Sequence, residues 1–175
     1  TALGGRAPHP YAHVQRAAAE RMLAAEVCLK EVVLREGIEI LPDDLNKTGL
    51  IGPEWTFLTT TPGAIEAKRS ALNPNFAALM VHYYEQAGLK PGDRVALGLS
   101  GSFPGLSIAA LCAATEMGLD VRVIASFGAS MYGATRPELT VPRMFGILRD
   151  EGLADYTLLA TSPGGEGDRM PESFL

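Results

Sequence analysis

Two kinds of hydrophobic pattern divide the chain. Residues 10–36 carry apolar side chains at steps of three and four, the spacing of one helical face, and Gly37 follows as a stop signal. This spacing predicts one long helix. Its apolar positions are Tyr11, Val14, Ala18, Met22, Ala25, Leu29 and Val32.

Short apolar runs at residues 95–99, 121–125 and 156–160 alternate with helical segments at 74–88, 106–118 and 140–152. Strand, helix and strand at this spacing are typical of βαβ units, whose strands are parallel. The runs read as strands buried on both faces. A further strand is predicted at 55–59 and a short helix at 64–71.

The predicted fold is α/β: a three-layer open, mainly parallel sheet with flanking helices and a long N-terminal helix. Residues 1–54 hold that helix and an irregular connection, and residues 55–175 form the α/β domain. The apolar stripe of the long helix is expected to cover the sheet. A helix of this length also suggests that residues 11–36 pack partly against another copy of the chain or a membrane partner.

Composition narrows the choice of partner. The 175 residues carry a formal net charge of −5 without any basic run, which argues against nucleic acid. No apolar stretch is long enough to span a membrane, and no secretory signal is visible. The first residue is Thr1 and the end is polar, so we expect that either end could be a cut end and that an anchor could lie outside this sequence.

Metal and disulfide chemistry are not expected. Cys28 and Cys112 are too few for a disulfide framework or a zinc site and read as buried thiols. His9 and His13 lie four residues apart, but no suitable third ligand is near them. The sequence therefore predicts neither a metal nor a cofactor.

Hydroxyl and glycine residues collect where four predicted strands end. Ligands of open α/β sheets bind at this edge, and the loop that begins at Ser100 leads directly into a helix, which favours a carboxylate or phosphate. The alternative is that these small residues only let the loops pack. The candidate ligand-binding residues are Thr59, Thr60, Thr61, Lys68, Ser100, Gly101, Ser102, Ser126, Ser130 and Ser162.

A catalytic role is the second hypothesis. Residues 98–102 place Ser100 at a strand-to-helix turn but lack the last glycine of an esterase elbow, and no histidine follows His82. The phosphate-binding and dinucleotide-binding glycine motifs are absent as well. A hydrolase or transferase that acts on an amide or phosphate ester would use Ser100 or Ser102 as its nucleophile. Lys68 is the one lysine close in the predicted cleft that could serve as a base.

Several unusual strings occur in one order and resemble the poly-gamma-glutamate system protein family. They are Phe57-Leu58-Thr59-Thr60-Thr61-Pro62-Gly63, Lys68-Arg69-Ser70 with the following Asn73-Pro74-Asn75-Phe76-Ala77-Ala78, Ser100-Gly101-Ser102-Phe103-Pro104-Gly105, Ser130-Met131-Tyr132-Gly133-Ala134-Thr135 and the tail 164–169.

The resemblance covers about residues 10–170 and implies a bacterial accessory protein, encoded beside the ligase and membrane components that make or export this capsule polymer. It implies a longer chain with a membrane-anchoring segment, and it carries over no catalytic residue. The expectation is a non-catalytic, membrane-associated component that binds an anionic small molecule or a gamma-glutamyl chain end. Its protein partners would be membrane components of the polymer system or another copy, through residues 11–36.

Overall fold

A computed structural model describes residues 10–169 of the chain. Helices and strands alternate through most of it, as the sequence predicts. In chain order the elements are α1 (Ala12–Arg35), β1 (Thr59–Thr61), α2 (Ile65–Ala71), α3 (Asn75–Gln86), β2 (Arg94–Leu99), α4 (Pro104–Glu116), β3 (Asp120–Ser126), β4 (Ala129–Ser130), the 3-10 turn η1 (Pro137–Leu139), α5 (Val141–Asp150), β5 (Thr157–Ser162) and the 3-10 turn η2 (Glu166–Asp168).

The main sheet is parallel and has the order β2-β3-β5. Val95 pairs with Val121, and Val123 pairs with Leu158, so the three predicted strands lie side by side in one direction. Strand β4, which follows β3, pairs in parallel with β1, which precedes α2. This small pair connects α2 to the carboxyl end of the main sheet. The predicted α/β fold with a parallel sheet is therefore confirmed.

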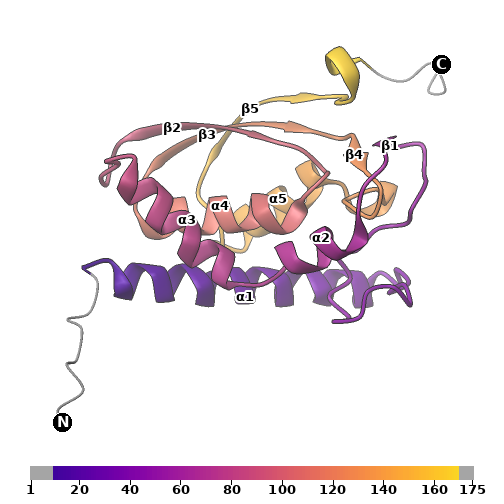
Figure 1. Cartoon of the computed structure of the whole chain (residues 1–175), viewed down its shortest axis with the longest axis horizontal. Helices are drawn as coiled ribbons and strands as arrows, with labels where there is room; N and C mark the ends of the chain where they lie inside the picture. Colours follow the sequence, from indigo (N-terminus) through magenta and orange to yellow (C-terminus); the bar gives the residue numbers. More distant parts are fainter. Residues whose placement is uncertain (1–9, 170–175) are drawn as a thin grey trace, which may run out of the picture.

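The helices form two layers on one side of the sheet. Figure 1 shows β2, β3 and β5 along one side, α3, α4 and α5 beneath them, and α1 beyond those helices. Helix α1 packs against α3, α4 and α5. The prediction that the long helix covers the sheet directly is wrong, because the middle helices occupy that place and α1 packs on them.

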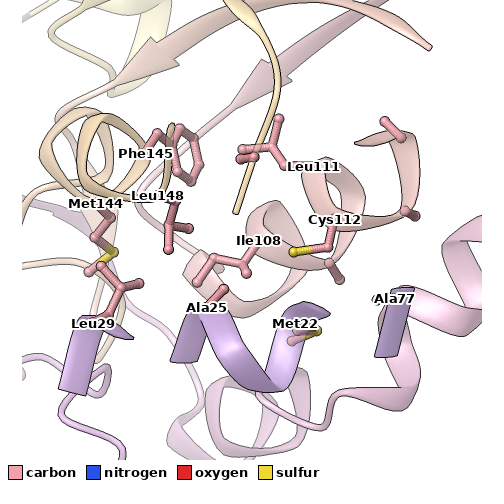
Figure 2. Packing of buried hydrophobic residues seen from close by; sticks show 14 of the residues in the cluster. Met22, Ala25, Leu29, Ala77, Ile108, Leu111, Cys112, Met144, Phe145 and Leu148 are labelled. Carbon is pink, nitrogen blue, oxygen red and sulfur yellow. The ribbon is translucent and has the colours of Figure 1, made fainter. Parts of the chain in front are cut away.

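The core lies mainly between α1 and the middle helices. Figure 2 shows the side chains of Met22, Ala25 and Leu29 from α1 pointing toward Ile108 and Cys112 of α4 and toward α5. All five of these residues are fully buried. Burial of a methionine, leucine or isoleucine side chain contributes about 2 kcal/mol, so the buried stripe of α1 stabilises the domain. Both predicted segments, 1–54 and 55–175, contribute to this one core.

The opposite face of the sheet is exposed. Gly98, Ile124 and Ala160 pair in register across β2, β3 and β5, and all three are exposed, while Val123 on the covered face is fully buried. The prediction of strands buried on both faces is wrong for this reason. A short apolar run does not show by itself whether a second layer covers the sheet.

The segment before β1 also differs from its prediction. Residues 55–59 are predicted as a strand, but the strand begins at Thr59. Thr56 forms a turn instead: its backbone N–H donates to Thr59 Oγ1 at 2.9 Å, and its hydroxyl donates to the carbonyl of Thr135 at 2.6 Å. Trp55 and Phe57 on either side are exposed. Within residues 10–169, none of the helices combines the length and apolarity needed to cross a membrane.

Two glycines at α5 provide a matched test of the backbone geometry. An added Cβ at Gly146, inside the helix, meets no atom within 4 Å, whereas Gly152 just after the helix has a φ of +70°. We expect Gly146→Ala to raise the free energy of unfolding by about 1 kcal/mol, since alanine loses less conformational entropy in a helix. Gly152→Ala should lower it by about 1 kcal/mol, because L residues are strained at positive φ. Urea unfolding measures the change in free energy for both variants. Equal changes in the two variants would contradict the end of α5 between these glycines.

Candidate functional site

The loops at the carboxyl ends of the strands are joined by backbone hydrogen bonds. The N–H of Gly101, after β2, donates to the carbonyl of Gly128 at 3.1 Å, and the Gly101 carbonyl accepts from Ala134 N–H at 2.7 Å. The N–H of Met131 donates to the carbonyl of Thr61 at 2.9 Å. The segments around residues 60, 101 and 130 therefore form one hydrogen-bonded cluster.

Lys68 reaches this cluster from α2. The helix begins just after the turn at Pro62 and Gly63, and its fourth residue turns inward, so that Lys68 is only 3% exposed. Its Nζ donates to the backbone oxygen of Ser102 and to Oγ of Ser130, both at 2.5 Å. Nζ also lies 3.7 Å from the centre of the Phe103 ring, a cation–π contact.

Among residues 10–169, the charge of Lys68 has no acidic partner. Arg69, Arg94 and other basic side chains make ion pairs, but within the described chain Lys68 makes none. Removal from water disfavours the ammonium form, so burial lowers the pKa of Lys68 below its ordinary value. Buried lysines without a carboxylate are rare in proteins, because an uncompensated charge is costly there.

Three serines form a chain of hydrogen bonds beside Lys68. Oγ of Ser102 accepts from the N–H of Ser130 at 3.0 Å, and Oγ of Ser100 accepts from the N–H of Ser102 at 3.3 Å. Ser130 is buried, Ser102 half-buried and Ser100 exposed. The hydroxyl of Ser130 is thus the one shown in contact with the lysine nitrogen.

Glycines let the backbone approach closely around Lys68 and Ser130. A Cβ on Gly63 would lie 3.2 Å from Ser130 Oγ and 3.3 Å from Lys68 Cε. A Cβ on Gly101 would lie 2.8 Å from the Cβ of Ala129. Tyr132 adopts a φ of 61°, which is uncommon for a bulky residue, in the turn that follows Ser130. This turn is closed by the Gly133 N–H, which donates to the Ser130 carbonyl at 3.0 Å.

Other predicted site residues use their hydroxyls to hold the loops. Thr59 Oγ1 contacts the Glu54 carbonyl at 3.4 Å, Thr60 Oγ1 donates to the Ala129 carbonyl at 3.2 Å, and Ser126 Oγ donates to the Gly128 carbonyl at 3.3 Å. Ser162 pairs with Ser126 between β5 and β3. These side chains lie at the predicted edge, and the contacts shown for the first three stabilise the loops.

Sequence reasoning missed several residues that shape the site. Phe103 contributes its ring beneath the lysine, and Gly63 and Tyr132 determine the turns beside it. Phe103 precedes Pro104 at the start of α4, a position that marks a helix boundary but carries no signal for a cation–π contact. The sequence also named Ser100 or Ser102 as nucleophile, whereas the hydroxyl next to the lysine belongs to Ser130.

A cavity of about 620 Å³ borders α2 and is lined in part by Arg69, Ser70 and Asn73. Arg69 already has a partner there, because its Nε donates to the Asp43 carbonyl at 2.8 Å. Arg69 also lies 3.8 Å from a carboxylate oxygen of Asp43, whereas Lys68 has no carboxylate partner among the described residues and is therefore the stronger candidate for an anion. His9, one of the two histidines four residues apart, lies outside the described residues, and the part of the chain that the structure describes holds no cluster of metal-ligating side chains.

Comparisons of this chain with protein-family models, with curated proteins and with solved structures found no match.

Proposed function

We propose that this protein is an accessory component of a bacterial poly-gamma-glutamate synthesis or export system that binds a carboxylate or phosphate group at Lys68. The observation that carries the binding role is the buried ammonium group, which has no acidic partner in the part of the chain that the structure describes. A bound anion would supply the missing charge and offset the cost of burial. The polymer system is proposed from the sequence strings that resemble that family.

The ligand that fits this proposal is the end of a gamma-glutamyl chain. Such an end carries free carboxylates, and a carboxylate is the negative group that would neutralise the buried charge of Lys68. The net charge of −5 does not favour binding of a long polyanion across the whole surface. Binding of a single glutamyl unit at one site is more compatible with this charge. Inorganic phosphate has similar charge and hydrogen-bonding capacity and serves as a simple probe.

The outer face of α1 supports a proposal about the partners of the protein. Leu23, Val27 and Leu34 are exposed on this helix at spacings of four and seven residues. An apolar stripe of this kind is suited to pack against another helix, either of a second copy or of a membrane component of the polymer system. Association with the membrane would come through such a component or through an anchor outside this sequence.

Ligand-dependent stabilisation tests the binding role. We expect an oligomer of gamma-linked glutamate at about 100 times its Kd to raise the free energy of unfolding by about 3 kcal/mol at low salt and neutral pH. Lys68→Met should abolish this rise. Lys90→Met, which removes an exposed lysine near the amino end of β2, should leave it unchanged. Equal stabilisation of the two variants would reject Lys68 as the binding group.

A further inference from the structure

The contact between Lys68 and Ser130 is not explained by anion binding alone. An ammonium group gains little from a neutral hydroxyl compared with a carboxylate, yet Nζ lies 2.5 Å from Ser130 Oγ. This separation places the two atoms within hydrogen-bond reach, which a base needs in order to take a proton from a nucleophile. The neutral amine would be satisfied here: one N–H donates to the Ser102 carbonyl, and the lone pair accepts the Ser130 proton.

The surroundings of Ser130 hold its hydroxyl in place. Its backbone N–H donates to Ser102 Oγ at 3.0 Å, its carbonyl accepts from Gly133 N–H at 3.0 Å, and β4 pairs it with β1. A Cβ at Gly63 would lie 3.2 Å from Oγ, so the glycine lets the turn before α2 pack closely against this serine. A nucleophile needs a fixed position of this kind.

Ser100 and Ser102 lack these features. The contacts shown for their hydroxyls are with backbone N–H groups, from Ser102 and Ser130 respectively. A hydroxyl that accepts from an amide gains no base. The arrangement therefore separates a positioning residue, Ser102, from the one serine that the structure places on the lysine nitrogen.

We propose that Ser130 is a nucleophile activated by Lys68, and that the site transfers acyl groups from an ester or amide. Oγ of Ser130 bonds to the acyl carbon while its proton passes to Nζ of Lys68. The C–O or C–N bond of the substrate then breaks, and the leaving group takes that proton. Water then attacks the serine ester and gives one proton to Lys68. The C–O bond of the ester breaks, Ser130 Oγ takes the second proton of the water, and a carboxylate leaves.

This inference rests on the proposed function in one respect: both use Lys68. The two roles belong to two protonation states of one side chain. The amine activates Ser130, and the ammonium formed during the reaction pairs with the carboxylate product. Anion binding should therefore weaken as the pH rises, while the reactivity of Ser130 should increase over the same range.

Labelling by a fluorophosphonate probe tests the catalytic role. In this reaction Ser130 Oγ bonds to phosphorus, fluoride leaves, and the serine proton passes to Lys68. We expect a single phosphonylated site at Ser130 by peptide mass spectrometry. The rate should rise with pH to a plateau reached below pH 10.5, the ordinary pKa of lysine, because burial favours the neutral amine. Ser130→Ala should remove labelling, and Lys68→Arg, which keeps the charge but cannot act as a base, should slow it at least about 100-fold.

Ser70→Ala is the matched control, since Ser70 is an exposed serine on α2, the helix that carries Lys68. It should label at the wild-type rate. Absence of labelling, labelling at another serine, or a rate that does not change with pH would each overturn the proposal. The labelled residue and the pH dependence of labelling are both measured on the wild-type protein. These two results decide the proposal even where a variant fails to fold.

The two proposals fail separately. Oligomer binding that persists in Ser130→Ala, without labelling of the wild type at any pH, would keep the binding role and reject the nucleophile. Labelling of Ser130 by a protein that no gamma-linked oligomer stabilises would keep the nucleophile and reject the proposed ligand.

Discussion

Replacing Glu26 by glutamine is expected to stabilise the protein by about 3 kcal/mol at pH 8.5, more than most substitutions stabilise a domain. Glu26 lies on the face of α1 that packs into the core, and it is 8% exposed. Its Oε1 has no hydrogen-bond partner within the described residues. Burial disfavours the carboxylate and raises the pKa of Glu26 from 4.5 to about 8. Glutamine keeps the shape of the side chain and removes the charge.

The sign of the pH dependence follows from this raised pKa. Below pH 4.5 both the folded and the unfolded chains carry a protonated Glu26, and its contribution to stability is complete. Between pH 4.5 and about 8 the folded protein binds more protons at Glu26 than the unfolded chain does, so stability falls as the pH rises. Above this range both states are ionised, and the folded state carries a buried charge.

Urea unfolding at pH 5.5, 7 and 8.5 measures this effect. The difference between Glu26→Gln and the wild type should grow with pH across these three values. Glu20→Gln, at an exposed position of the same helix, is the matched control and should change stability little at each pH. If the wild type and Glu26→Gln lose stability in parallel, the carboxyl group of Glu26 is not the cause.

The hydrophobic pattern predicted α1 and the parallel strands because both depend on local spacing. The same spacing contains a signal for Glu26, which follows Met22 by four residues and precedes Leu29 by three, on the buried stripe. It could not show that α1 packs on other helices, since an apolar stripe looks the same whichever element covers it. It also could not show that Ile124 lies on an uncovered face of the sheet.

The candidate site, like the fold, could be predicted from local sequence patterns only in part. The position of hydroxyl residues after the strands predicted that Ser102 and Ser130 lie at one edge, because parallel strands end together. The contact of Lys68 with Ser130 joins residues 62 positions apart, through a helix whose orientation depends on the turn at Gly63. No local pattern encodes that distance. A lone lysine in the sequence is far more often a solvated side chain than a buried one.

Gly133→Ala is expected to lower the free energy of unfolding by about 3 kcal/mol and to displace Ser130 from Lys68. A Cβ at this position would lie 2.3 Å from the Gly101 carbonyl oxygen, 2.9 Å from that of Ser102 and 3.0 Å from that of Ser130. All three are backbone atoms, which cannot rotate away as a side chain can. The turn after β4 and the loop after β2 must therefore separate, and both of them position the serines.

Gly98→Ala provides the control, because an added Cβ on β2 meets no atom within 4 Å. It should change stability by less than about 1 kcal/mol and leave fluorophosphonate labelling of Ser130 at the wild-type rate. Gly133→Ala should lose both stability and labelling, whereas a folded Gly133→Ala protein that labels normally would show that the turn does not position Ser130. The comparison separates a glycine that the site needs from one that the strand merely tolerates.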